Sequence, residues 1–105
     1  MDKELLEQYT FIKIEIADLE KRLESTSHST VDISKLQQSL KALEGIRHQI
    51  EIEIYSVDDS FIRSLLRFRY IDGMTWADAA KKFGEGYTPD MLRKAHQRFI
   101  RKTEQ

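Results

Sequence analysis

The side chains best suited to chemistry in this sequence are basic and amide groups that cluster near its C-terminal end. Thr88, Pro89 and Asp90 form a helix start signal, because threonine caps helices, proline fits the first turn and a carboxylate favours the positive end of the helix dipole. In the helix expected from Pro89, apolar residues recur at spacings of three and four and indicate an inward face. The outward face holds Arg93, Lys94, Gln97, Arg98, Arg101 and Lys102.

Such groups recognise DNA when they lie on a helix that enters a groove. Arg93 or Lys94 suits guanine and Gln97 suits adenine, whereas Asp90 can accept a hydrogen bond from the amino group of cytosine. Basic residues further along the helix are expected to meet phosphates. The alternative is an ordinary amphipathic helix with a solvated charged face. The predicted DNA contacts are Thr88, Pro89, Asp90, Arg93, Lys94 and Gln97, followed at the backbone by Arg98, Arg101 and Lys102.

A second helix start signal lies upstream, where Thr75 and Asp78 form a variant of the capping box, T-x-x-D. It predicts a helix from Trp76 to Phe83, closed by Gly84, which suits a left-handed position after the last turn. Two short helices joined by a tight turn, the second of them basic, are typical of a helix-turn-helix whose second helix enters a DNA groove.

The stretch from residue 61 to residue 102 resembles region 4 of the sigma-70 family. The likeness lies in the link before the first short helix, in the alanine and aromatic positions of that helix, and in the capped, basic last helix. It implies that the DNA-contacting positions at the start of the last helix fall on Pro89, Asp90, Arg93 and Lys94, with proline in place of the usual polar residue. The matching residues are Arg69, Tyr70, Gly73, Thr75, Ala79, Phe83, Gly84 and Thr88.

The whole chain, with a helical segment ahead of this domain, is similar to small phage transcriptional regulators of the ArpU/RinA type. That similarity implies sequence-specific binding to double-stranded DNA at a promoter region, and activation of phage or prophage genes. Two other function classes remain open. One is a phage DNA-packaging component such as a small terminase subunit, which would form a ring. The other is an interaction module that docks on RNA polymerase or on another regulator without binding DNA.

The N-terminal half has the apolar spacing of two long helices. One heptad-like seam consists of Leu5, Tyr9, Ile12, Ile16, Leu19 and Leu23. A second seam consists of Ile33, Leu36, Leu40, Leu43, Ile50 and Ile54, with Arg47 within it. The polar segment 25–32 between them predicts a loop, so the two helices are expected to return antiparallel as a coiled-coil hairpin. The alternative is a short β-hairpin, because the segments 12–16 and 50–54 alternate apolar and charged residues.

Ile14 and Ile52 fall outside the main seams, with Phe11 and Tyr55 near them. They define a second apolar face, for which a lone hairpin has no use, whereas two hairpins can bury such faces in a four-helix bundle. We therefore expect a homodimer that forms through residues 1–55. The alternative is a monomer in which these residues cover the C-terminal domain.

Residues 56–59 interrupt the N-terminal pattern and begin a third helix with a wide apolar surface. This helix is expected to support the two short helices, with Trp76 in the shared core because an aromatic residue there is more often structural than base-stacking. Arg63, Arg67 and Arg69 are expected at the surface, where they would touch phosphates or RNA polymerase.

The charges divide along the same line as the predicted elements. Residues 1–55 hold seven basic and eleven acidic side chains, a net charge of −4, whereas residues 56–105 hold ten and seven, a net charge of +3. An acidic half joined to a basic half is typical of a DNA-binding domain fused to a second, different module. We therefore expect an all-α fold, with an oligomerising antiparallel helical hairpin over residues 1–55 and a three-helix helix-turn-helix domain over residues 56–105.

The sequence gives little support to catalysis or to metal binding. Its three histidines fall in three separate predicted elements, and it has no cysteine and no glycine-rich phosphate loop. His96 is expected at the surface, where its protonated form would contact phosphate. The chain has no apolar run of about 18 residues and no signal-peptide pattern at its start. We therefore expect a cytoplasmic protein that is not an enzyme and uses neither a metal nor a cofactor.

Overall fold

The computed structural model describes residues 1–25 and 30–104, and every regular element within these ranges is helical. The all-α class predicted from the sequence is therefore confirmed. The β-hairpin alternative is wrong, because both of its segments lie inside long helices. Residues 26–29 of the predicted loop, with His28, lie outside the described residues. The prediction that the loop extends to residue 32 is wrong, because α2 already begins at Thr30. The elements are α1 (Lys3–Glu24), α2 (Thr30–Tyr55), α3 (Ser60–Leu66), the π-helical turn η1 (Arg67–Ile71), α4 (Trp76–Phe83) and α5 (Pro89–Thr103).

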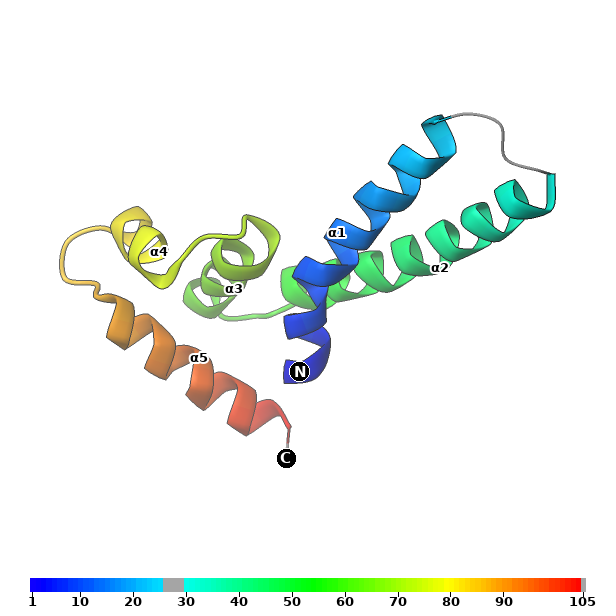
Figure 1. Cartoon of the computed structure of the whole chain (residues 1–105). Coiled ribbons are helices and arrows are strands. Elements are labelled where there is room, and N and C mark those ends of the chain that lie inside the picture. The colour runs from blue at the N-terminus through cyan, green and yellow to red at the C-terminus, as the bar shows by residue number, and fades with distance from the viewer. Residues whose placement is uncertain (26–29, 105) are drawn as a thin grey trace.

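Helices α1 and α2 lie side by side and extend away from the other helices, as Figure 1 shows. Asp2 caps α1 by accepting from the backbone N–H groups of Glu4 and Leu5. The buried seam of α1 begins at Leu6, so the prediction of Leu5 as its first member is wrong. The reason is that the first turn of α1 lies against the end of α5, where Leu6 shares the first core with Ile100.

The first hydrophobic core lies where α1 and α2 meet η1 and α5. Its buried members come from both halves of the chain, so the core crosses the division expected between residues 55 and 56. A polar contact reinforces the junction, because Lys13 Nζ on α1 donates to the carbonyl oxygen of Ile71 at the end of η1, at 2.8 Å. The members of this core are Leu6, Tyr9, Ile12, Ile16, Ile50, Ile54, Leu66, Tyr70 and Ile100.

The second hydrophobic core lies among α3, α4 and α5. Three of its five buried residues are alanines, which allow the helix backbones to approach closely, and partly buried aromatic rings surround them. Phe83 is central to this ring set, with centroids 5.1 Å from Phe61 and 5.2 Å from Phe68. Trp76 also packs on this core, as expected. The buried members are Leu65, Ala79, Ala80, Leu92 and Ala95.

The second apolar face expected on α1 and α2 is exposed in the single chain but lies in two places. Phe11, which is 64% exposed, lines a groove with Gly73 and Met74. Ile52, which is 44% exposed, lines a different groove with Leu5. Phe11 and Ile52 thus border different grooves, and Ile14 and Tyr55 are also exposed.

Candidate nucleic-acid interface

Helix α4 begins and ends where the sequence predicts. The hydroxyl of Thr75 accepts from the backbone N–H of Asp78 at 3.1 Å, which satisfies one of the free donors of the first turn. The helix ends at Phe83, and Gly84 follows with a φ of +107°, a region that only glycine adopts without strain. The turn from residue 84 to residue 88 then carries the chain into α5.

Helix α5 also has its predicted start and its predicted cap. The hydroxyl of Thr88 accepts from the backbone N–H of Met91 at 3.2 Å, and Pro89 occupies the first helical position. Leu92 and Ala95 are buried in the second core and Ile100 in the first. One helix is therefore anchored in both cores, and this fixes the direction in which its opposite face points.

The exposed face of α5 gathers the predicted contact residues. At 3.6 residues per turn, Asp90, Lys94, Gln97 and Arg101 form one line along the helix, and all four are exposed. Arg93 flanks this line on one side, and Arg98 and Lys102 flank it on the other. Thr88 and Pro89 lie at the start of the helix, where the threonine hydroxyl is engaged in the cap and the proline is half-buried.

Three of the residues predicted to face bases contact one another. The carboxylate of Asp90 lies 3.3 Å from Nη1 of Arg93 and 3.0 Å from Nζ of Lys94. All three side chains are about half exposed or more, so these ion pairs are weak and easily exchanged for others. The cluster presents two cations and one acceptor near the first turn of α5, which is the set of groups needed to bind guanine and cytosine edges.

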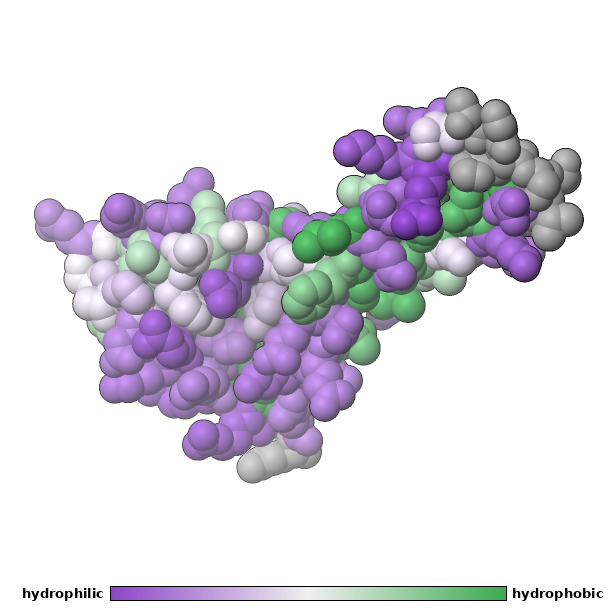
Figure 2. Space-filling model, in the orientation of Figure 1, coloured by the Kyte–Doolittle hydropathy of each residue, from purple (hydrophilic) through white to green (hydrophobic). Residues whose placement is uncertain are grey.

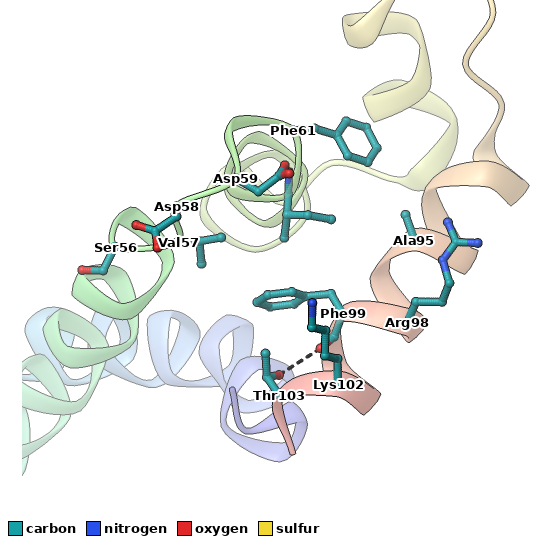
Figure 3. A pocket seen from close by; sticks show the side chains of 11 residues that line it. Ser56, Val57, Asp58, Asp59, Phe61, Ala95, Arg98, Phe99, Lys102 and Thr103 are labelled. Atoms are coloured by element: carbon teal, nitrogen blue, oxygen red, sulfur yellow. Dashed lines mark hydrogen bonds between the residues drawn. The ribbon is translucent and has the colours of Figure 1, made fainter. Parts of the chain in front are cut away.

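The flank of α5 with Arg98 and Lys102 borders a groove of about 620 Å³. Figure 3 shows these side chains across the groove from the segment that joins α2 to α3, where Asp58 and Asp59 lie. Asp59 is engaged there as the cap of α3, accepting from the backbone N–H of Ile62 at 2.9 Å. The two basic residues thus lie away from the line of Lys94 and Arg101, on the side of the helix that faces the rest of the protein.

His96 is buried, and the prediction that it lies at the surface is wrong. Only 7% of it is exposed, its Nε2 lies 2.6 Å from the hydroxyl of Tyr70, and its ring meets the edge of Trp76 with centroids 5.3 Å apart. Burial, helped by the charges of Arg69 and Lys3, lowers the pKa of His96 from 6.5 to about 4. His96 is therefore neutral at pH 7, and it joins α5 to η1 and α4 instead of contacting phosphate.

The arginines of α3 and η1 are half-buried and hold neighbouring segments in place. Arg69 donates to the carbonyl oxygen of Met74 at 3.1 Å, and its guanidinium lies 4.6 Å from the centre of the Trp76 ring. Arg63 donates to the carbonyl oxygen of Val57 at 2.8 Å. Arg67 lies over the ring of Tyr55, at 5.4 Å. Sequence reasoning missed these contacts, because each joins a side chain to a backbone carbonyl or ring that the sequence does not mark.

Other kinds of site have no counterpart in the described part of the chain. Across residues 1–25 and 30–104, no group of three or more histidine, aspartate or glutamate side chains is arranged to hold a metal ion. None of the described helices combines the length and the apolar character that crossing a membrane would require. Figure 2 shows mostly hydrophilic residues around α5, and a band of hydrophobic residues among hydrophilic ones over α1 and α2.

The outward face of α5 is thus the strongest candidate site, positioned by two capped helix starts, one glycine turn and two cores. Comparison with family models, with curated proteins and with solved structures found no match.

Proposed function

We propose that this protein binds double-stranded DNA with sequence specificity, using α4 and α5 as a helix-turn-helix. The single observation that carries the proposal is the exposed line of Asp90, Lys94, Gln97 and Arg101 on a helix whose opposite face is anchored in two cores. A helix that reads bases must be fixed in direction and must present donors and acceptors at its outer surface. Both conditions are met by α5.

Charge supports the same conclusion despite a net charge of −1 for the whole chain. Helix α5 holds five basic side chains against the single carboxylate of Asp90. Lys81 and Lys82, exposed in the last turn of α4, add two more positive charges on the preceding helix. Phosphate contacts supply much of the affinity for DNA, and a locally basic surface is sufficient to provide them.

Self-association through residues 1–55 is the second part of the proposal. In the outer parts of α1 and α2 the seam residues Leu19, Leu23, Leu36, Leu40 and Leu43 remain half-exposed. Two helices cannot fully cover a shared apolar seam, whereas a second pair from another copy can. A dimer would present two α5 helices to two half-sites. With the resemblance to small phage regulators, this favours a transcriptional activator of phage or prophage genes over a DNA-packaging subunit.

Selection from a random duplex library at about 150 mM salt tests the proposal, because non-specific binding weakens strongly at that salt concentration. The expected result is an enriched inverted repeat, whose half-site spacing reports the geometry of the dimer. Binding without an enriched motif would favour packaging. The absence of binding even at low salt would favour an interaction module that docks on another protein.

A pair of double variants tests the surface directly. Arg93→Ala with Lys94→Ala should weaken binding to the selected duplex by about 1–3 kcal/mol for each good base contact. Lys35→Ala with Lys41→Ala removes the same charge from exposed positions on α2 and should leave affinity nearly unchanged. Equal losses in the two variants would count against base recognition by α5.

The oligomeric state is tested by sedimentation of the full chain over a range of concentrations. We expect a dimer that dissociates on dilution, and Leu36→Lys with Leu40→Lys should shift it to monomer without removing binding to a single half-site. A large ring would instead favour the packaging alternative.

A further inference from the structure

The first turn of α1 lies against the last turn of α5, although the two are at opposite ends of the chain. The backbone N–H of Lys3 donates to Oε1 of Glu104 at 3.1 Å, and the Met1 amino group lies 3.3 Å from the carbonyl oxygen of Thr103. Leu6 and Ile100 are buried together in the first core just behind these contacts. The start of α1 is therefore held next to the helix proposed to read DNA.

A depression of about 310 Å³ lies at this junction. Its floor includes His96 and Ile100, which are buried, and its rim includes Lys3, Gln97 and Arg101, which are exposed. Gln97 and Arg101 belong to the proposed recognition surface, whereas Lys3 comes from the other half of the chain. The Lys3 ammonium forms an exposed ion pair with the carboxylate of Glu7, at 3.9 Å, and such a pair is weak enough for a phosphate to compete with it.

We propose that Lys3, Gln97 and Arg101 form a binding site for a phosphate of the DNA backbone. This inference rests on the proposed function and extends it, because it assigns part of the DNA-binding surface to α1. The free oxygens of a phosphate only accept hydrogen bonds. The ammonium of Lys3 and the guanidinium of Arg101 only donate them, and the amide of Gln97 can donate through its NH₂ group. A phosphate here would lie one to two turns beyond Asp90, Arg93 and Lys94. Gln97 would then contact the backbone instead of adenine, as later residues of a recognition helix commonly do.

Glu104 also lines the depression, and its carboxylate opposes an anion. Its Oε1 is held by the backbone N–H of Lys3, at the positive end of α1. Lys3, Arg101 and Glu104 together carry a net charge of +1, and the carboxylate of Glu7 lies 3.9 Å from the Lys3 ammonium. Two variants should therefore change the affinity for DNA in opposite directions. The removal of the Lys3 charge should weaken binding, and the neutralisation of Glu104 should strengthen it.

The experiment measures the affinity of the full chain for a selected duplex and for a random duplex between about 50 and 200 mM salt. Lys3→Ala should weaken both complexes several-fold by the same factor and reduce the slope of log affinity against log salt by about one. Lys3→Arg should restore both quantities. Lys21→Ala, which removes an exposed lysine from the far end of α1, should change neither the affinity nor the slope.

Two further measurements locate the contact. Glu104→Gln keeps a hydrogen-bond acceptor and should tighten both complexes. Replacing single phosphates by uncharged methylphosphonates should reveal one position whose neutralisation weakens the wild type but not Lys3→Ala. If the wild type binds DNA and Lys3→Ala matches Lys21→Ala in slope, the phosphate site is wrong and the proposed function stands. If the wild type binds no duplex, the proposed function fails, and this site fails with it.

Discussion

The two hydrophobic cores of this protein are built from different kinds of side chain. The first joins α1 and α2 to the rest of the chain with large side chains, mainly leucine and isoleucine, from both halves of the sequence. The second joins three short helices with alanines at the points of closest approach and aromatic rings around them. Large aliphatic groups bury much apolar area, whereas alanines let helix axes approach and set their positions.

The difference indicates which core supplies stability and which one sets geometry. The first core is formed by long helices with extensive seams, and it stabilises the whole molecule. The second core fixes α4 relative to α5 and so fixes the exposed face of α5. Since α5 contributes Ile100 to the first core and Leu92 to the second, the two cores should not unfold separately.

The largest expected effect tests that coupling. Ile54→Ala in the first core and Leu92→Ala in the second, both at positions with 0% exposure, should each lower the free energy of unfolding by about 2–5 kcal/mol. Urea denaturation should show one transition in each variant, with Trp76 fluorescence and helical circular dichroism changing together. If Ile54→Ala moved only the circular dichroism transition, the two cores would be independent units.

The next effect concerns the buried pair between the cores, Tyr70 and His96. The pKa of His96 is lowered to about 4 in the folded chain, so the unfolded chain binds this proton more tightly. Stability is therefore complete above pH 6.5 and falls between pH 6.5 and pH 4, by about 2–3 kcal/mol for this group. Urea denaturation at pH 7 and pH 4.5 should show this loss in His48→Asn, an exposed control, and a smaller one in His96→Asn. Equal pH dependence in the two variants would contradict the assignment.

The packing of the second core gives a smaller effect. Ala79, which has 0% exposure, faces the core, whereas Ala77 on the same helix is exposed. Ala79→Leu should destabilise the protein by about 1–3 kcal/mol through overpacking. Ala77→Leu should change stability by less than about 0.5 kcal/mol. The displacement of α4 in Ala79→Leu should also weaken DNA binding beyond the loss of stability, which a binding assay well below the melting temperature would detect.

The smallest expected effects are on stability and concern two glycines, one with a positive φ and one within a helix. Gly84 has a φ of +107°, so Gly84→Ala should destabilise the protein by about 1 kcal/mol through backbone strain. Gly45 lies within α2, and a Cβ there would meet nothing within 4 Å. Gly45→Ala should therefore stabilise the protein by about 0.5–1 kcal/mol. Thermal denaturation of both variants should shift in opposite directions, and shifts of the same sign would contradict this account of α2 or of the turn.

Features that depend on neighbours in the sequence were predictable from it. The caps at Thr75 and Thr88 each use a hydroxyl and an N–H three residues later, so the contact forms within one turn. The bounds of α4, the start of α5 and the exposure of Lys94 and Arg101 follow from those caps, from Gly84 and from the helical period.

The sequence alone determined the helical class, the starts of α4 and α5 and the exposed charged residues of α5, because caps and periodicity act over a few residues. Only the tertiary structure decided that Leu6 replaces Leu5, that His96 is buried against Tyr70, and that Lys3 and Arg101 line the same depression. Each of these depends on a second helix arriving from a distant part of the chain. The direction of that approach is set by how whole side chains pack, which no local spacing records.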